Sequence, residues 1–379
     1  MRSGSFKTNL MKKITVLIFL IHCYTVNAQG DKEVIQDKLY KTAISRAKKF
    51  LDSLQVKQGI PGMAVCVGNK EKILWAEGLG FADLENKGRV TIQSKFRLGS
   101  VSKLLTTLAI GQLYQNGQWD LDAPIQKYLP DFPEKKYPIT SRQLAGHVAG
   151  IRHYIKSDPV SIPKRYKSVQ EGISIFKDDS LLFKPGTAYG YSTFGYCLLS
   201  AVAEAVSHVD FLSYMRDSIF LPLGMTNTLA DYNDSIVPGR VRFYENNKGH
   251  LVNAALVDNS YKWAGGGFLS TPVDLVNMVR GLLNHVLLNE KTVELLFTSQ
   301  HLENGKDIHV GIGWRIDADS TGRRFIHHGG VVDGGRTFLM LYPDEGMIVA
   351  ITANISGANI NVKEAQAIAG YFFNTMKKQ

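Results

Sequence analysis

The chain has 379 residues, of which 44% are hydrophobic and 21% charged, and it carries a formal net charge of +10. This length exceeds the usual limit for one hydrophobic core, so the sequence predicts two lobes or one large two-layer domain. The ordinary composition excludes a disordered or fibrous protein. No basic cluster is interleaved with aromatic residues, so we expect no nucleic-acid partner.

The first 28 residues have the pattern of a cleavable signal peptide. A positively charged segment at 11–13, with lysines at 12 and 13, precedes an apolar run at 14–21, and residues 26–28 offer the small-x-small pattern that signal peptidase cuts. We therefore expect cleavage after Ala28 and a periplasmic or secreted mature protein; Met11 is an alternative start. The apolar run is shorter than the roughly 20 residues of a membrane-spanning helix, so we expect no stable membrane insertion after cleavage.

Cleavage would remove four basic residues and no acidic one, which lowers the formal charge to +6. It would also remove Cys23, where lipidation is disfavoured because His22 stands at a position that requires a small residue. The two remaining cysteines are Cys66, in an apolar strand pattern, and Cys197, in an apolar helix pattern. We expect two buried free thiols rather than a disulfide framework.

Along the mature chain, hydrophobic periodicity predicts strands near both ends and helices in the middle. Amphipathic spacing indicates a first helix at 33–58 and a closing helix at 362–376. The helices expected between them lie at 100–114, 194–207, 211–220 and 273–287. The expected strands lie at 63–67, 73–77, 311–316, 324–327, 337–342 and 347–352.

This order of elements predicts an α+β fold for residues 29–379. One antiparallel sheet would be built from about 60–98 and 308–355, with flanking helices. The segment from about 115 to 300 would form an inserted, mainly helical lobe. We expect a cleft where the lobe meets the sheet.

A Ser-x-x-Lys motif marks one candidate nucleophile, although the motif occurs four times. Ser100 follows a strand-like segment at 95–98 and a glycine, and it opens a helix whose next turns are apolar. Free amides and the positive helix end at that position favour a developing negative charge. Lys103 would lie on the same face, one turn away. The alternative is a capping serine beside a surface lysine. The other pairs are Ser45/Lys48, Ser161/Lys164 and Ser174/Lys177.

A serine needs a base to become a nucleophile, and an ordinary lysine with a pKa of about 10.4 is charged. Burial or a coupled group must therefore lower the pKa of Lys103, and a second proton-handling residue is expected. Tyr191 is the candidate, because it stands in a loop that follows a Pro-Gly turn, just before the helix at 194–207. The alternative is an aromatic residue packed for stability.

A third element is the run His327-His328-Gly329-Gly330 at the end of an expected strand. Glycines at a strand edge let a substrate backbone approach. We expect the amides of Gly330 and Ser100 to form an oxyanion hole. The alternative is an ordinary strand end.

These three elements, in this order, resemble the motifs of the serine β-lactamase and penicillin-binding protein superfamily. The likeness is to its class C-type and esterase-like branch, in which the tyrosine follows a Phe-x-Pro-Gly run and the last motif is often His-x-Gly. It extends over about residues 40–375. Several stretches resemble the β-lactamase-like serine proteins of animal mitochondria: 152–154, 191–196 and 257–271.

The resemblance implies a β-lactamase-like fold and an exported serine hydrolase that forms an acyl-enzyme at Ser100. It implies amide, ester or β-lactam substrates, substrate contacts from Thr193, His327 and Gly329, and no cofactor or metal. Thr193 replaces a common asparagine, and His327 replaces the lysine that holds the carboxylate of penicillins. Because a neutral histidine offers less charge than a lysine, weak or absent β-lactamase turnover is expected.

Other functions remain open at this stage. A true β-lactamase would turn over penicillins, whereas a penicillin-binding sensor or scaffold would keep the fold without turnover. The sequence shows no His-Glu-x-x-His motif and no Gly-x-Ser-x-Gly motif, which argues against a zinc peptidase and against an α/β-hydrolase.

Overall fold

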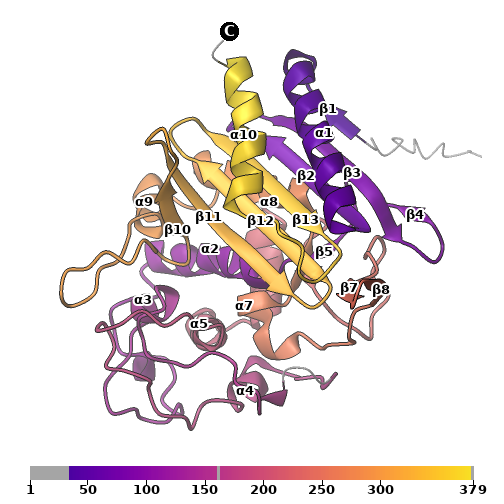
Figure 1. The fold of residues 1–379 in the computed structure, drawn as a ribbon. Coiled ribbons are helices and arrows are strands. Elements are labelled where there is room, and N and C mark those ends of the chain that lie inside the picture. Colours follow the sequence, from indigo (N-terminus) through magenta and orange to yellow (C-terminus); the bar gives the residue numbers. More distant parts are fainter. Residues whose placement is uncertain (1–33, 160–162, 377–379) are drawn as a thin grey trace, which may run out of the picture. The chain divides into compact units, whose positions relative to one another are not determined.

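The computed structural model describes residues 34–159 and 163–376, so the predicted signal peptide lies outside the described residues. Its centre is an antiparallel sheet in the order β1-β3-β2-β13-β12-β11-β10, with β4 paired to β3 (Figure 1). The α+β fold class predicted from the sequence is confirmed. The strands are β1 (Val34–Gln36), β2 (Gly62–Gly68), β3 (Ile73–Asp83), β4 (Gly88–Arg89), β10 (Arg315–Ala318), β11 (Arg324–Val332), β12 (Gly335–Tyr342) and β13 (Met347–Ala353).

The two faces of the sheet are covered by different layers. Helices α1 (Lys41–Gln58) and α10 (Val362–Met376) pack against each other on one face, as Figure 1 shows. Helix α8 (Pro272–Leu283) contacts β2 and β13 on the other face. Because side chains alternate along a strand, β13 supplies both cores. Val349 and Ile351 join the α1/α10 core, and Ile348 and Ala350 join the lobe core.

The helical lobe is built around α2 (Ser102–Gln115), which is buried along nearly its whole length. It packs against α5 (Phe194–Ser207), α7 (Trp263–Gly266) and α9 (Glu290–Leu296). A helix that is buried on all sides needs apolar residues around its whole circumference, and the sequence of α2 meets this condition. The lobe also contains α3 (Ser141–Ala145), α4 (Val169–Ile173) and α6 (Phe211–Tyr214).

Two smaller groups of strands complete the described structure. Strand β9 (Phe268–Ser270) pairs on both sides, with β5 (Phe96–Arg97) and β6 (Leu229–Ala230). This sheet leads the chain from β5 into the turn before α2. Strands β7 (Tyr244–Asn247) and β8 (His250–Asn253) form a separate hairpin.

Several local predictions were wrong for physical reasons. Residues 34–36 form edge strand β1 rather than the start of a helix, because they pair with β3 between Trp75 and Glu77. Helix α6 continues as a π-helix at Met215–Phe220 instead of one α-helix. Helix α8 ends at Leu283, four residues early, and strand β10 begins at Arg315 rather than at residue 311.

Other predictions hold at the level of single residues. The closing helix α10 has the predicted bounds, 362–376. Thr271 caps α8, since its side chain accepts a hydrogen bond of 3.1 Å from Asp274 N. Cys66 and Cys197 are both buried free thiols. Within the described ranges, no helix combines the length and the apolar character needed to cross a membrane.

Candidate active site

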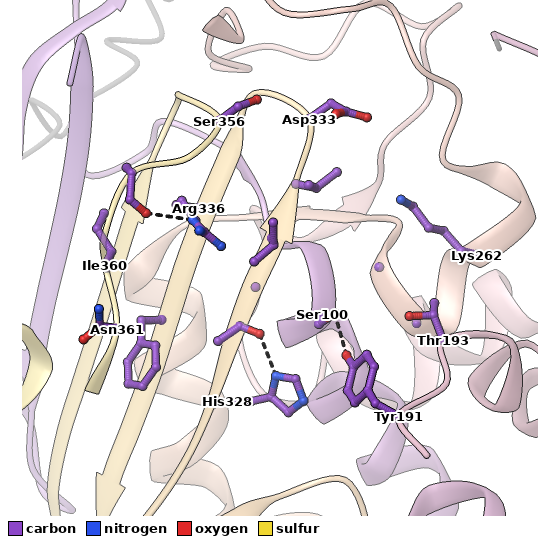
Figure 2. A pocket seen from close by; sticks show the side chains of 18 of the residues that line it. Ser100, Tyr191, Thr193, Lys262, His328, Asp333, Arg336, Ser356, Ile360 and Asn361 are labelled. Carbon is purple, nitrogen blue, oxygen red and sulfur yellow. Dashed lines mark hydrogen bonds between the residues drawn. The ribbon is translucent and has the colours of Figure 1, made fainter. Parts of the chain in front are cut away.

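A cavity of about 790 Å³ opens where the helical lobe meets the sheet (Figure 2). Residues from both layers line it, including Ser100 before α2, Tyr191 before α5 and the end of β11. Ser100, Tyr191, Thr193, His327, Gly329 and Gly330, which the sequence singled out as site residues, all line this cavity. The predicted cleft between lobe and sheet is therefore present.

A tight backbone approach positions Ser100. It lies in a 3₁₀ turn, η2 (Gly99–Val101), and Gly99 adopts a left-handed φ of 51°. A Cβ at Gly99 would lie 2.7 Å from Val331 N, so a larger residue would push η2 away from β11. The glycine before the serine thus sets how closely the nucleophile can approach the strand.

Ser100, Lys103 and Tyr191, which come from separate stretches of sequence, meet at one oxygen. Tyr191 Oη donates a hydrogen bond of 2.7 Å to Ser100 Oγ, and Lys103 Nζ lies 3.2 Å from the same oxygen. Lys103 therefore approaches the serine from one turn along α2, as the motif predicts.

The other Ser-x-x-Lys pairs have different surroundings. Ser45 is exposed on α1, and Lys48 pairs with Glu77. Ser174 donates to the main chain at Glu171 O, 2.6 Å away. Ser161 lies outside the described residues. Among the described members of these four pairs, Ser100 is the residue that lines the cavity.

Lys103 is fully buried, and this burial changes its chemistry. The desolvated site lowers the pKa of Lys103 to about 7; the nearby Cys197 thiol opposes the shift and Arg315 adds to it. Its other partners are Gly265 O at 2.7 Å and Thr193 Oγ1 at 3.1 Å. Among the described residues no carboxylate pairs with it, so a large fraction of the amine is neutral near pH 7 and able to accept a proton.

Tyr191 stays protonated in this site. Burial raises the pKa of its phenol, although the hydrogen bond to Ser100 and the charge of Arg315 act in the opposite direction. The Tyr191 ring packs against His147 at a centroid distance of 4.4 Å, and Lys103 Nζ lies 5.0 Å from its centroid. A phenol held this way can pass a proton between the serine oxygen and a bound molecule.

Two histidines that sequence reasoning did not assign a role hold the loop that carries Tyr191. His147 Nδ1 accepts a hydrogen bond from Ser192 N, and His153 Nδ1 accepts one from Thr193 N, both at 3.2 Å. Burial lowers the pKa of both histidines, to about 4 for His153, so the rings are neutral acceptors at pH 7. His153 stands in the family-like stretch 152–154, which was the available sequence signal for it.

Thr193 has a contact that its predicted substrate role did not include. Its hydroxyl binds the amine of Lys103, as described above, and only part of the residue faces the cavity. Thr193 is 3% exposed. The residue therefore helps to orient Lys103, and any contact with substrate would be made from this fixed position.

The paired histidines at 327 and 328 lie on opposite faces of β11, because side chains alternate along a strand. His327 Nε2 is 2.8 Å from Asp317 Oδ2, and its ring stacks on Phe338 on the α10 side. The His328 ring instead faces Tyr191, at a centroid distance of 6.3 Å (Figure 2). His327 lines the cavity as predicted, but His328 is the histidine on the side of the nucleophile.

The His328 ring is held in one tautomer. Its Nδ1 lies 2.7 Å from Gly329 O, and a carbonyl can only accept, so Nδ1 carries the proton. Burial lowers the pKa of His328 well below 6.5, with Lys103 and Arg315 adding to the shift. The ring is therefore neutral and leaves Nε2 as an acceptor.

The register of β11 selects the amide that can face Ser100. Val332 pairs with Gly335 across a two-residue turn. From that pair on, residues that hydrogen-bond to β12 alternate along β11 with residues that do not. The peptide groups of Val332 and Gly330 point to β12, and those of Val331 and Gly329 point to the opposite edge. The amide that faces η2 is therefore that of Val331, one residue beyond the predicted Gly330.

Gly330 nevertheless has a strict packing role. A Cβ at Gly330 would lie 1.9 Å from Leu98 O and 3.4 Å from Ser100 N. No side chain fits at this distance without moving β11 from η2. The predicted importance of this glycine thus has a different physical cause, which is close contact with the chain that carries the nucleophile.

The remaining charged residues of the cavity are Arg315 on β10, Arg336 on β12, Lys262 at the end of the 3₁₀ helix η6 (Ser260–Lys262), and Asp333 in the turn between β11 and β12. Arg315 donates to Tyr189 Oη at 3.3 Å, and its guanidinium carbon lies 5.9 Å from the Tyr191 ring centroid. Within the part of the chain that the structure describes, no group of three or more His, Cys, Asp or Glu side chains could hold a metal ion.

This sheet-and-lobe fold, with a serine between a buried amine and a phenol at the junction, is that of the β-lactamase-like serine hydrolases. The chain belongs to the β-lactamase family, whose sequence model matches residues 45–370. It is 30% identical to the human serine beta-lactamase-like protein LACTB, mitochondrial, over 86% of this chain and 79% of that protein. It is 29% identical to a β-lactamase of Escherichia coli, over 82% and 76%.

Solved structures show the same fold at lower sequence identity. The octameric penicillin-binding protein homologue from Pyrococcus abyssi superposes with a TM-score of 0.75 and 23% identity, over 87% of this chain and 77% of that chain. A D-stereospecific amidohydrolase from Streptomyces superposes with a TM-score of 0.72 and 24% identity, over 86% and 97%.

Proposed function

We propose that this protein is a serine hydrolase that cleaves amide or ester bonds through an acyl-enzyme at Ser100, as a peptidase or esterase with weak or no β-lactamase turnover. The observation that carries the proposal is the convergence on Ser100 Oγ of Tyr191 Oη at 2.7 Å and Lys103 Nζ at 3.2 Å. The pKa of about 7 for Lys103 supports it, because a neutral amine is available near neutral pH.

Acylation follows from this arrangement. The neutral amine of Lys103 takes the proton of Ser100 as its oxygen attacks the substrate carbonyl, and the amides of Ser100 and Val331 stabilise the resulting oxyanion. Tyr191 gives its proton to the leaving nitrogen or oxygen and is reprotonated by Lys103. In deacylation, water replaces the leaving group, and the same groups transfer protons in the reverse direction.

The surroundings of β11 support weak turnover of β-lactams. The ring beside the nucleophile is the neutral His328 and not a lysine, so the cations available for a penicillin carboxylate are Arg315, Arg336 and Lys262, which line the cavity and lie further from Ser100 Oγ than Lys103 does. We expect penicillins to acylate Ser100 and to leave slowly. Efficient hydrolysis of several β-lactams by the purified protein would contradict this expectation.

The test of the proposal is covalent labelling followed by mass spectrometry. The protein is treated with a fluorophosphonate, and the adduct is located in peptides. We expect one adduct, on Ser100, and none in Ser100→Ala. Ser45→Ala is the matched control, because Ser45 has the same motif on exposed helix α1; it should label at the wild-type rate. Equal labelling of wild type and Ser100→Ala would overturn the proposal.

We also propose that the protein acts outside the cytoplasm after removal of residues 1–28, with a small peptide, ester or β-lactam as its substrate. The basic, apolar and small-residue segments of the N-terminus support this proposal. The mass of the mature protein from the native organism tests it. A mature N-terminus at Gln29 is expected, and an intact N-terminus in a cytoplasmic fraction would contradict it.

A further inference from the structure

One end of the cavity holds a buried ammonium that the proposed reaction does not use. Lys262 is 9% exposed and lines the cavity, and Figure 2 shows its side chain directed into the open space. Across the described chain, no hydrogen bond or ion pair reaches Lys262 Nζ. The contacts that it makes are with two aromatic rings, Tyr261 at 5.2 Å and Tyr154 at 5.7 Å from the ring centroids.

A buried charge without a partner is costly unless a ligand supplies one. Burial lowers the pKa of Lys262 to about 8, and Asp333 limits the shift, so most of the ammonium stays protonated at pH 7. Asp333 is exposed at the cavity rim and lies beyond ion-pair distance. The two rings compensate part of the cost, since cation–π contacts contribute about 0.5–2 kcal/mol. They leave the three N–H donors without a protein acceptor among the described residues, so these donors are available to the cavity.

Lys262 is also close to the reacting serine. A Cβ placed on Gly266 would lie 3.6 Å from Lys262 Cε and 3.7 Å from the carbonyl carbon of Gly99. That carbon is bonded to the amide nitrogen of Ser100. The Lys262 side chain and the Gly99–Ser100 peptide therefore lie on two sides of the position that a side chain at residue 266 would occupy. Because residue 266 is glycine, no side chain stands between them.

The position of Lys262 indicates which half of a substrate it would meet. Tyr191, which protonates the leaving group in the proposed reaction, faces His328 at one end of the cavity. Lys262 lies at the other end, beyond Thr193 (Figure 2). The leaving group departs beside its proton donor, so the acyl part of the substrate extends towards Lys262.

We propose that Lys262 is a specificity-determining residue that binds a carboxylate on the acyl part of the substrate. This inference rests on the proposed acyl-enzyme at Ser100. A carboxylate a few bonds from the scissile carbonyl would receive charge-assisted hydrogen bonds from this ammonium on the cavity wall. Acyl groups with a terminal carboxylate are then preferred over neutral acyl groups of the same length.

A binding experiment tests the inference without any turnover. The Ser100→Ala protein is titrated with monomethyl adipate, which is an anion at pH 7, and with the neutral diester dimethyl adipate. We expect the monoester to bind about tenfold tighter or more, which is the effect of one charge-assisted hydrogen bond. In Ser100→Ala/Lys262→Met the two ligands should bind equally. Persistence of the preference in that variant would overturn the inference.

A matched control separates Lys262 from general surface charge. Lys164 also lies against a tyrosine, with Nζ 4.6 Å from the Tyr166 ring centroid, but its side chain is 51% exposed. Ser100→Ala/Lys164→Met should keep the preference for the anionic ligand. If Lys262 only stabilised the tyrosine cluster, Lys262→Met would lower the melting temperature and leave the ratio of the two affinities unchanged.

Turnover provides a second, independent measurement. The wild type and Lys262→Met are compared on 4-nitrophenyl hexanoate and on the 4-nitrophenyl monoester of adipic acid. Lys262→Met should lower kcat/KM about tenfold for the adipate ester and little for the hexanoate. Absence of Ser100 labelling would refute the proposed hydrolase, whereas labelling with no preference for the carboxylate would refute the role of Lys262 alone.

Discussion

Two helices of this protein carry the same Ser-x-x-Lys motif in different layers. On α1, Ser45 is exposed, and the Lys48 side chain is 44% exposed and paired with Glu77. Before and within α2, Ser100 lines a cavity, and Lys103 is fully buried with no carboxylate partner among the described residues. The motif brings a hydroxyl and an amine together in both places. Burial alone converts the second pair into a candidate nucleophile and base.

The difference extends to the two faces of the sheet. The core under α1 and α10 is a cluster of apolar side chains. The lobe face buries Lys103, Lys262, His147 and His328 around the cavity. Buried polar groups of this kind reduce stability, so the outer layer should contribute mainly stability and the inner layer mainly chemistry.

The largest expected effect separates the two lysines. Lys103→Met should lower kcat/KM by about 10³ to 10⁴, because it removes the proposed base. The melting temperature should stay unchanged or rise, since a buried amine is replaced by an apolar chain of similar volume. Lys48→Met should keep full activity. Steady-state hydrolysis measures the activity, and thermal unfolding measures the stability. Comparable activity losses in Lys103→Met and Lys48→Met would contradict the claim that burial makes Lys103 the base.

A second change tests the outer layer. Phe372 on α10 is fully buried in the apolar core. Phe372→Ala should lower the free energy of unfolding by about 3–5 kcal/mol through lost contacts and a cavity. Below the unfolding transition, kcat/KM should match the wild type. Urea denaturation gives the first quantity. A large loss of activity in fully folded Phe372→Ala protein would show that the two layers are coupled.

A third change removes one oxygen. Tyr191→Phe should slow acylation by about 10², the effect of losing a positioned proton donor. Tyr196→Phe is the matched control, because the Tyr196 ring also lies near Lys103, at 5.4 Å, while its hydroxyl donates to Ala145 O. Stopped-flow acylation measures both rates. If Tyr196→Phe slowed acylation as much as Tyr191→Phe, general packing would explain the loss.

The smallest predicted effect separates the neighbouring histidines of β11. His328→Ala should lower kcat/KM by about tenfold, because its ring faces Tyr191 and the nucleophile. His327→Ala should change kcat/KM less than threefold and lower stability by about 1–2 kcal/mol, since its ring packs on Phe338. The reverse order of activities would show that the assignment of the two faces is wrong.

Sequence patterns predicted the elements whose residues alternate or repeat regularly. Strands β12 and β13, helix α5 and helix α10 lie within a few residues of the predicted positions. The helix expected at 33–58 was wrong at residues 34–36, because the open edge of β3 offers these residues a partner that local periodicity cannot reveal. Prediction failed where a long-range contact overrides the local preference.

The same limit applies to the site. Ser100, Lys103 and Tyr191 carry motifs, and all three could be named before the structure. Whether the amide of Gly330 or of Val331 faces Ser100, and whether His327 or His328 lies on the side of the nucleophile, depends on the register of β11. A shift of one residue moves every side chain to the other face of the sheet and every amide to the other edge of the strand. Lys262 stands in the family-like stretch 257–271, but nothing in the sequence assigns it a role, and its burial at the cavity reveals it.

The most direct test of the account is the pH dependence of Ser100 acylation by an uncharged fluorophosphonate. The proposed base is the neutral form of Lys103, whose pKa is about 7, so labelling should slow about tenfold for each pH unit below 7 and level off above it. A midpoint near 7 that disappears in Lys103→Met is the predicted result. A midpoint near the ordinary lysine value of 10.5, or a rate independent of pH, would contradict the account.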